Sequence, residues 1–180
     1  MLRHILVAID KSVASHQAFD MALELAQGLG AKLTLVHVLD IFDPTSPQRP
    51  HPSANSYSME LDNLLRENYE RQWNEFVQHY DSLLKQRQQQ AEAMGIVCDY
   101  LQPYGPPGSA LCRVASDCQA DVILVGSHSR RGLSEMLLGS VSNYITHHAP
   151  CSVLVVHPEH SRAPTSPQKS TATMTAGSVA

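Results

Sequence analysis

The sequence predicts an α/β fold: a single doubly wound, five-stranded parallel sheet with helices on both faces. Two observations support this prediction. Short runs of continuous apolar character, typical of strands buried on both faces, recur along the chain. They alternate with segments whose apolar residues follow helical spacing, which indicates parallel strands joined by crossover helices. Because such crossovers are right-handed, the expected strand order is 3-2-1-4-5.

The first three elements are short and regular. The apolar run HILVAID, residues 4–10, predicts a strand that ends at Asp10. A helix is expected next, and its apolar face is formed by Ala18, Phe19, Ala22, Leu25, Ala26 and Leu29. Gly30 lies where a residue of positive φ would end this helix. The run KLTLVHVLD, residues 32–40, then predicts the second strand.

A long loop and a long helix follow. Residues 40–56 contain four prolines, which exclude regular structure and predict a loop. Residues 57–94 contain neither glycine nor proline and predict a helix that Gly95 ends. Its apolar face is formed by Leu61, Leu64, Leu65, Tyr69, Phe76, Tyr80, Leu83, Leu84 and Ala91. The first half of this helix could project beyond the core and meet a partner subunit, or the whole could be a surface helix; the sequence leaves both open.

The second half of the chain repeats the alternation of strand and helix. Gly108 or Ser109 is expected to open the third helix, and the last helix is expected to begin near Ser140 and end near Ala149. The segment IVCDYLQPYGPPGS, residues 96–109, is expected to form the third strand and a Gly/Pro turn. The last two strands are expected at residues 121–126 and 152–156.

Length and composition limit the possible functions. We expect one domain over residues 1–158 and a disordered tail over residues 159–180, which are rich in Ser, Thr, Ala and Pro. The net charge of −4 argues against a nucleic-acid partner. No apolar run approaches the ~18–20 residues of a membrane span, so no membrane partner is expected. The four cysteines form no C-x-x-C pair, and a cytoplasmic location is expected.

Two Gly-Ser pairs flank the loop between the fourth strand and the last helix, at Gly126-Ser127 and Gly139-Ser140. In doubly wound sheets, ligands bind beyond the strand ends where the strand order reverses, here at Asp10 and Gly126. The free N–H groups of a helix start favour an anion site. However, the sequence has neither the P-loop pattern nor G-x-G-x-x-G after the first strand. On spacing alone, Ser140 could equally serve only as the N-cap of the helix.

The loop resembles that of the universal stress protein family, whose nucleotide-binding members carry G-x2-G-x9-G-[ST] between this strand and helix. Gly126, Gly139 and Ser140 match the pattern, whereas Ser129 stands where the family has its second glycine. The likeness covers roughly residues 3–157 and includes ILVAID, LVHV, VGSH, LLGSVS and APCSVLVV. It implies a Rossmann-like fold. If Ser129 occupies a strained position, replacing it with glycine should tighten ligand binding or leave it unchanged.

The resemblance also implies a site for an adenine nucleotide, ATP or AMP. Carried over by position, the nucleoside would lie against Ala8, Ile9 and Asp10, and the adenine edge against the backbone of Val38. The ribose and the phosphates would contact Val125, Gly126, His128, Ser129, Gly139, Ser140, Val141 and Ser142 through N–H groups and hydroxyls, with Arg130 and Arg131 as further phosphate partners. A Mg²⁺ ion could join the phosphates near Asp10.

Three functions are compatible with these residues. The first is a homodimeric, adenine-nucleotide-binding regulatory protein of the stress response. The second is a nucleotide-activating enzyme or slow ATPase; the AIDKSVAS segment lacks the glycines of a Ser-Gly-Gly-x-Asp-Ser loop, and no base accompanies a nucleophile, so weak ATP hydrolysis is the most that we expect. The third is an interaction module without nucleotide. The dimer is expected through residues 152–156, because an apolar edge strand without blunting residues requires a partner.

Overall fold

The computed structural model describes residues 2–50, 59–127 and 138–158. Four predicted site residues, His128, Ser129, Arg130 and Arg131, lie outside the described residues, as does the predicted tail at residues 159–180.

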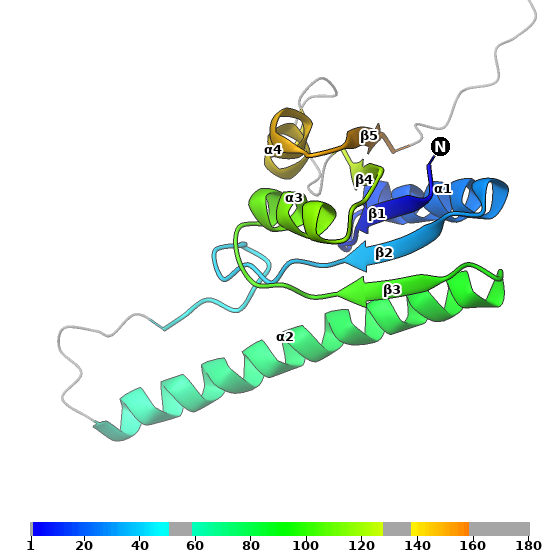
Figure 1. Ribbon diagram of the computed structural model, residues 1–180. Coiled ribbons are helices and arrows are strands. Elements are labelled where there is room, and N and C mark those ends of the chain that lie inside the picture. The colour runs from blue at the N-terminus through cyan, green and yellow to red at the C-terminus, as the bar shows by residue number, and fades with distance from the viewer. Residues whose placement is uncertain (1, 51–58, 128–137, 159–180) are drawn as a thin grey trace, which may run out of the picture.

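A five-stranded sheet forms the centre of the fold, and its order is β3-β2-β1-β4-β5 (Figure 1). All four neighbouring pairs are parallel, which confirms the predicted fold class. The strands are β1 (His4–Ala8), β2 (Lys32–Val36), β3 (Cys98–Leu101), β4 (Val122–Gly126) and β5 (Ser152–Val156). The helices are α1 (Val13–Leu29), α2 (Met59–Ala93), α3 (Pro107–Asp117) and α4 (Ser140–His148).

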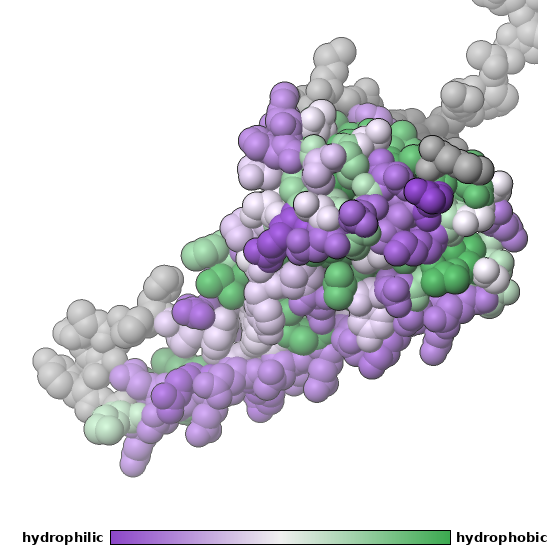
Figure 2. All heavy atoms as spheres, in the orientation of Figure 1, coloured by the Kyte–Doolittle hydropathy of each residue, from purple (hydrophilic) through white to green (hydrophobic). Residues whose placement is uncertain are grey.

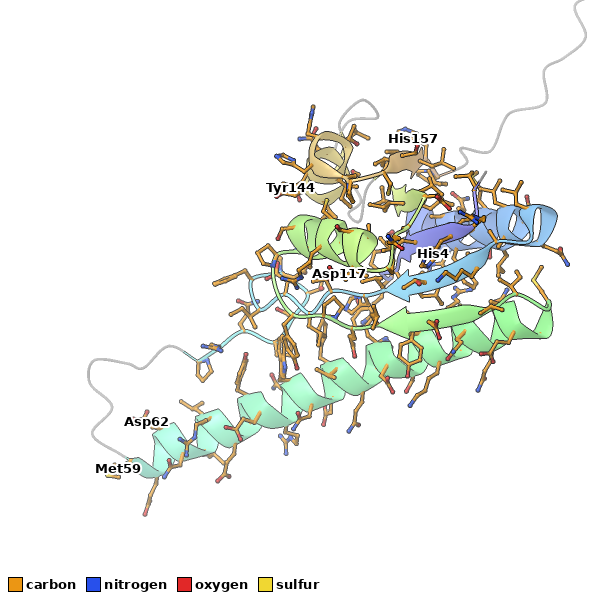
Figure 3. All side chains as sticks on the ribbon, in the orientation of Figure 1. His4, Met59, Asp62, Asp117, Tyr144 and His157 are labelled. Atoms are coloured by element: carbon orange, nitrogen blue, oxygen red, sulfur yellow. The ribbon has the colours of Figure 1, made fainter. Side chains whose placement is uncertain are left out.

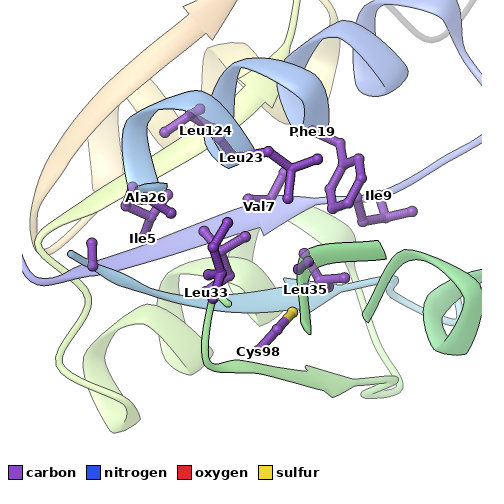
Figure 4. Packing of buried hydrophobic residues seen from close by; sticks show 14 of the residues in the cluster. Ile5, Val7, Ile9, Phe19, Leu23, Ala26, Leu33, Leu35, Cys98 and Leu124 are labelled. Carbon is purple, nitrogen blue, oxygen red and sulfur yellow. The ribbon is translucent and has the colours of Figure 1, made fainter. Parts of the chain in front are cut away.

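Two hydrophobic layers hold the helices to the sheet. On one face, α1 and α2 cover Ile5, Val7 and Leu33, and Phe19 of α1 is fully buried among them (Figure 4). On the other face, α3 and α4 cover Leu6 of β1 and the side chains of Ile123 and Val125 of β4. Each layer takes alternate residues of the same strands, as expected when both faces of a sheet are buried.

The strands are shorter than the apolar runs that predicted them. β1 ends at Ala8, so Ile9 and Asp10 leave the sheet, and β2 ends at Val36, two residues before Val38. The chain diverges at these points because α1 begins just after Asp10. The apolar runs continue past the strand ends because the residues beyond them are still buried against the loops, as Leu39 is.

Two helix boundaries depend on the backbone. Gly30 has φ of 66° and ends α1, as the sequence predicted. α3, in contrast, begins at Pro107 rather than at Gly108 or Ser109. Proline is favoured at the first helical position because its N–H group is not needed there and its φ already suits a helix.

The long helix α2 extends well beyond the sheet, and no other described helix or strand lies beside its first turns (Figure 1). Met59 and Asp62 lie near its far end, away from the other strands and helices (Figure 3). The outer side of α2 is almost continuously hydrophilic (Figure 2). Tyr80, Leu84 and Ala91 are its buried residues, so the second half holds the helix to the core. Within the described ranges, no helix is long and apolar enough to cross a membrane.

Candidate functional site

A cavity of about 120 Å³ opens at the carboxyl ends of β1 and β4, where the strand order reverses. The structure brings ten predicted site residues together around it: Ala8, Ile9, Asp10, Val38, Val125, Gly126, Gly139, Ser140, Val141 and Ser142. We call this cavity the switch-point cavity. The segments that form it are far apart in sequence and meet because parallel strands end at the same edge of the sheet.

Ser15 fixes the chain where it leaves β1. Its hydroxyl accepts the Asp10 N–H at 2.9 Å and donates to the Ala8 carbonyl at 3.2 Å. The Asp10 carboxylate in turn accepts the N–H of Ser12 at 2.7 Å, and Ser12 caps α1 through the Ser15 N–H. These bonds hold Asp10 at the wall of the cavity, and among the described residues its second carboxylate oxygen has no hydrogen-bond partner.

Val38 lines the cavity with backbone groups that the sheet does not use. The N–H groups of His37 and Leu39 donate to the segment that follows β3, at 3.2 and 2.8 Å. Since backbone groups alternate sides along an extended chain, those of Val38 point the opposite way, toward β1. There the last bond is Ile9 N–H to Val36 C=O, at 2.8 Å. Within residues 2–50, 59–127 and 138–158, neither the N–H nor the C=O of Val38 has a partner.

The start of α4 forms the other end of the cavity. Gly139 is its N-cap, and a glycine has no side chain with which to satisfy the first N–H groups of the helix. Ser140 is therefore the first helical residue and not the cap that it could have been. The Gly139 N–H is itself used, because it donates to the Ser127 carbonyl at 2.7 Å. The next three residues, Ser140, Val141 and Ser142, form the first turn of α4 and line the cavity, and the N–H groups of a first helical turn have no partner within the helix.

Ser142 has a structural role that its position in the motif did not indicate. We expected its hydroxyl to donate to phosphate, but it is 1% exposed and lies within hydrogen-bonding distance of the carbonyls of Ser127, at 3.1 Å, and Gly139, at 3.0 Å. A hydroxyl has a single proton to donate. Ser142 therefore ties the first turn of α4 to the end of β4, and it offers a ligand its backbone rather than its hydroxyl.

Gly126 is also explained by packing. We expected its missing side chain to let a ligand approach the backbone. A Cβ built on Gly126 instead lies 2.8 Å from the Ala14 Cβ and 2.9 Å from the Ala14 carbonyl carbon. Glycine is thus required because α1 begins against the end of β4. Gly126 lines the cavity and positions it through this contact.

Replacing Gly126 with alanine should destabilise the protein by about 1–3 kcal/mol, because the added methyl group collides with backbone that cannot move freely. Gly28→Ala is the matched control. Gly28 is exposed in α1 and nothing lies within 4 Å of its Cβ, so this change should stabilise by roughly 0.5–1 kcal/mol. Urea unfolding measures both. Equal effects for the two variants would refute the packing explanation.

His37, the residue directly after β2, forms a wall of the cavity. It is 7% exposed, and its Nδ1 lies 2.8 Å from the Ile9 carbonyl, so Nδ1 carries the proton and donates. Its ring stacks on Tyr80 of α2, with 3.4 Å between the ring centroids. Burial lowers the pKa of His37 and raises that of Tyr80 to about 12. Both side chains are therefore neutral at pH 7.

Protonation of two buried histidines should weaken the fold in mild acid. Burial also lowers the pKa of His4, whose ring nitrogens bond the Cys118 carbonyl at 2.9 Å and the Thr34 hydroxyl at 2.7 Å. The unfolded chain binds protons below the ordinary pKa of 6.5, before the folded chain does. Stability is thus complete above pH 6.5 and falls toward the lowered pKa values, by up to about 1.4 kcal/mol per pH unit for each histidine.

Urea unfolding at pH 7.0 and pH 5.5 checks this expectation. His37→Asn should remove about half of the pH dependence, because the amide can still donate to the Ile9 carbonyl but does not titrate. A pH slope that is the same in this variant would show that His37 does not contribute.

The two ends of the switch-point cavity differ in charge. Asp10 and Asp43 line the end near Val38, whereas the opposite end is the N-terminus of α4 with its partial positive charge. The α4 end of the cavity therefore favours anionic groups of a ligand. The end with the two carboxylates favours hydrogen-bond donors. Among the described residues, no group of three or more His, Cys, Asp or Glu side chains could hold a metal ion.

Sequence reasoning missed several wall residues, namely Ser15, Val36, His37, Asp43, Pro107, Leu111 and Ser127. One signal was present for His37, a polar residue inside an otherwise apolar strand run. Asp43 had no such signal. It belongs to the loop after β2, which a turn places over the cavity: the Asp43 carboxylate accepts the N–H and the hydroxyl of Thr45, each at 2.7 Å.

Comparison with known proteins identifies the family. The model of the universal stress protein family matches residues 1–157. A universal stress protein of Synechocystis sp. (strain PCC 6803) is 46% identical over 93 residues, which cover 52% of this chain and 86% of that protein. A putative universal stress protein of Staphylococcus aureus (strain USA300) is 31% identical over 172 residues, covering 94% of this chain and 92% of that protein.

Solved structures agree with these matches. The universal stress protein UspA from Lactobacillus plantarum superposes with a TM-score of 0.64 at 26% identity, and the match covers 86% of this chain and 97% of that chain. A universal stress protein in complex with cAMP superposes with a TM-score of 0.58 at 25% identity, covering 88% and 99%. With the parallel sheet and the cavity at its switch point, these matches show that the chain belongs to the universal stress protein family.

Proposed function

We propose that the switch-point cavity binds an adenine nucleotide, ATP or AMP, and that the protein acts as a nucleotide-responsive regulator of the stress response. The observation that supports this most strongly is the pair of free backbone groups on Val38 at one end of the cavity. The helix start of α4 at the opposite end supports it independently. A nucleotide has a base that could bond the backbone groups of Val38 at one end, and a phosphate that could bind at the start of α4 at the other.

Val38 would select adenine. The N–H and C=O of one residue, side by side, suit a ring edge that offers an acceptor next to a donor. Adenine offers this pair as N1 and the N6 amino group, whereas guanine reverses the two and would place its O6 against the Val38 carbonyl. An unsatisfied buried polar group costs about 1–3 kcal/mol, so AMP should bind roughly tenfold or more tightly than GMP.

The charges of the cavity set the orientation of the ligand. The Asp10 and Asp43 carboxylates accept hydrogen bonds and repel phosphate, so they would face the amino group or the ribose hydroxyls. The phosphates would then lie at the N–H groups of Ser140 and Val141, where the helix dipole favours an anion. A Mg²⁺ ion bound through the phosphates would then lie at the α4 end of the cavity and not near Asp10, where the sequence suggested it. The cAMP complex of a related universal stress protein is consistent with such a site.

Isothermal titration calorimetry tests the proposal directly. AMP and ATP should bind more tightly than adenosine, and GMP should bind weakly. Release of inorganic phosphate from ATP, followed over hours, separates regulated binding from turnover. The proposal would be abandoned if no adenine compound gave a saturable heat, or if GMP bound as tightly as AMP.

We further propose that the protein is a cytoplasmic homodimer joined through β5. The strand lies at the edge of the sheet next to β4, and Leu154 is 38% exposed there. An exposed apolar edge favours pairing with a second strand, and two copies of the same strand satisfy each other in a closed two-fold contact.

A further inference from the structure

Beside the switch-point cavity lies a second cavity, of about 140 Å³, between the start of α1, the loop after β2 and the middle of α2. The two cavities share Asp10, His37, Val38 and Asp43. Lys11, Asp40, Phe76 and Tyr80 line the second cavity and do not line the first. The proposed nucleotide site therefore leaves the residues that line only the second cavity without a role.

Carboxylates dominate the second cavity. Asp10, Asp40 and Asp43 line it, against Lys11 as the single cation among its lining residues. One oxygen of each carboxylate accepts the backbone N–H two residues further along, at 2.7, 2.9 and 2.7 Å. In the part of the chain that the structure describes, the second oxygen of each has no partner. The cavity thus carries a negative charge and offers free acceptors.

Aromatic rings of α2 form the wall opposite the loop. The rings of Phe76 and Tyr80 meet edge to face, with 5.1 Å between their centroids. The Lys11 ammonium lies 5.2 Å from the centroid of Tyr80, so a cation already lies against this ring. Ring faces attract cations, most strongly when water is excluded.

His37 supplies an independent sign of a missing partner. It lines both cavities and is more than nine-tenths buried. Since Nδ1 donates to the Ile9 carbonyl, Nε2 is an acceptor. It is the one buried side-chain nitrogen or oxygen, within the described ranges, that has no hydrogen-bond partner. Such a nitrogen requires an N–H or O–H donor that the protein itself does not provide there.

We propose that the second cavity binds a small organic cation that carries N–H donors, a guanidinium or primary ammonium group. Its N–H groups donate to the free oxygen of Asp40 and to His37 Nε2, and its charge lies against the ring of Tyr80. Anions are excluded by the carboxylates. The two cavities share a wall, and any effect of this cation on the affinity of a ligand in the switch-point cavity is matched by an equal effect of that ligand on the affinity of the cation.

Titration of the ¹⁵N-labelled full chain with methylguanidinium chloride, followed by NMR at constant ionic strength and without nucleotide, tests this inference. Saturable shifts are expected at the amides of Lys11, Ser12, Asp40 and Tyr80. Tetramethylammonium has the charge but no donors, so it should bind at least about fivefold more weakly. The absence of saturation, or equal affinity for tetramethylammonium, overturns the proposal. So does saturation by MgCl₂ alone, which would indicate a metal site.

Charge variants sharpen the test. Asp40→Asn keeps a side-chain oxygen that can accept the Phe42 N–H but removes the negative charge. It should weaken methylguanidinium binding roughly fivefold. Asp20→Asn on the exposed side of α1 makes the same charge change and should have no effect. Lys11→Gln removes the competing cation and should tighten binding roughly threefold. Equal effects of Asp40→Asn and Asp20→Asn overturn the proposal. Failure of AMP to bind, by contrast, would refute only the nucleotide site.

Discussion

Replacing Gly139 with valine should lower the affinity for AMP and ATP on the order of 100-fold or more. Gly139 lines the cavity at the start of α4, and its φ of −60° and ψ of 158° are open to any residue. The valine side chain would therefore keep the backbone in place but occupy the approach to the first N–H groups. Each charge-assisted hydrogen bond lost costs about 1.5–3 kcal/mol, and two such losses give the expected change.

Adenosine distinguishes this mechanism from general damage. It has no phosphate, so its affinity should be nearly the same for Gly139→Val and the unaltered protein. The fold should lose only about 1 kcal/mol, because valine is a poor N-cap. Gly28→Val, on the exposed side of α1, is the control and should bind AMP normally. If calorimetry gave the same AMP affinity for Gly139→Val as for the unaltered protein, the phosphate would not bind at the start of α4.

The sequence predicted the elements that depend on local pattern. The apolar runs, Gly30 at the end of α1 and the unbroken segment that became α2 gave the order of elements and, through crossover handedness, the topology. The glycine-serine motif also predicted which segments line the cavity. These features could be predicted because periodicity, helix-ending glycines and handedness do not require knowledge of distant contacts.

The roles of individual residues could not be predicted in the same way. Gly126 and Ser142 match a ligand-binding pattern, yet Gly126 makes room for α1 and Ser142 ties α4 to β4. Both roles depend on which segment lies opposite in space. Val38 became available for the same kind of reason: its backbone groups are free because β1 ends at Ala8 and the chain turns away there. A motif thus predicts the location of a site more reliably than it predicts the role of each residue in that site.

The second large effect is expected at β5, and the direction of the backbone groups decides which residue to change. Val156 accepts the Ser127 N–H at 2.8 Å, so its backbone faces β4. Backbone groups alternate sides along a strand, and those of Leu154 therefore face β4 as well. Proline at Leu154, the change that the exposed apolar edge first suggests, would break the sheet itself. The outward N–H groups belong to Val153 and Val155.

Val155→Pro should therefore convert the dimer to a folded monomer. Proline removes the outward N–H and is tolerated on an edge strand, because the ladder to β4 does not use that group. Val155→Ala loses similar side-chain volume but keeps the N–H, so it should remain dimeric. Light scattering should give about 19.8 kDa for the proline variant and twice that mass for the other two proteins. A monomeric unaltered chain at micromolar concentration, or a dimeric proline variant, would show that β5 does not join two copies through its backbone.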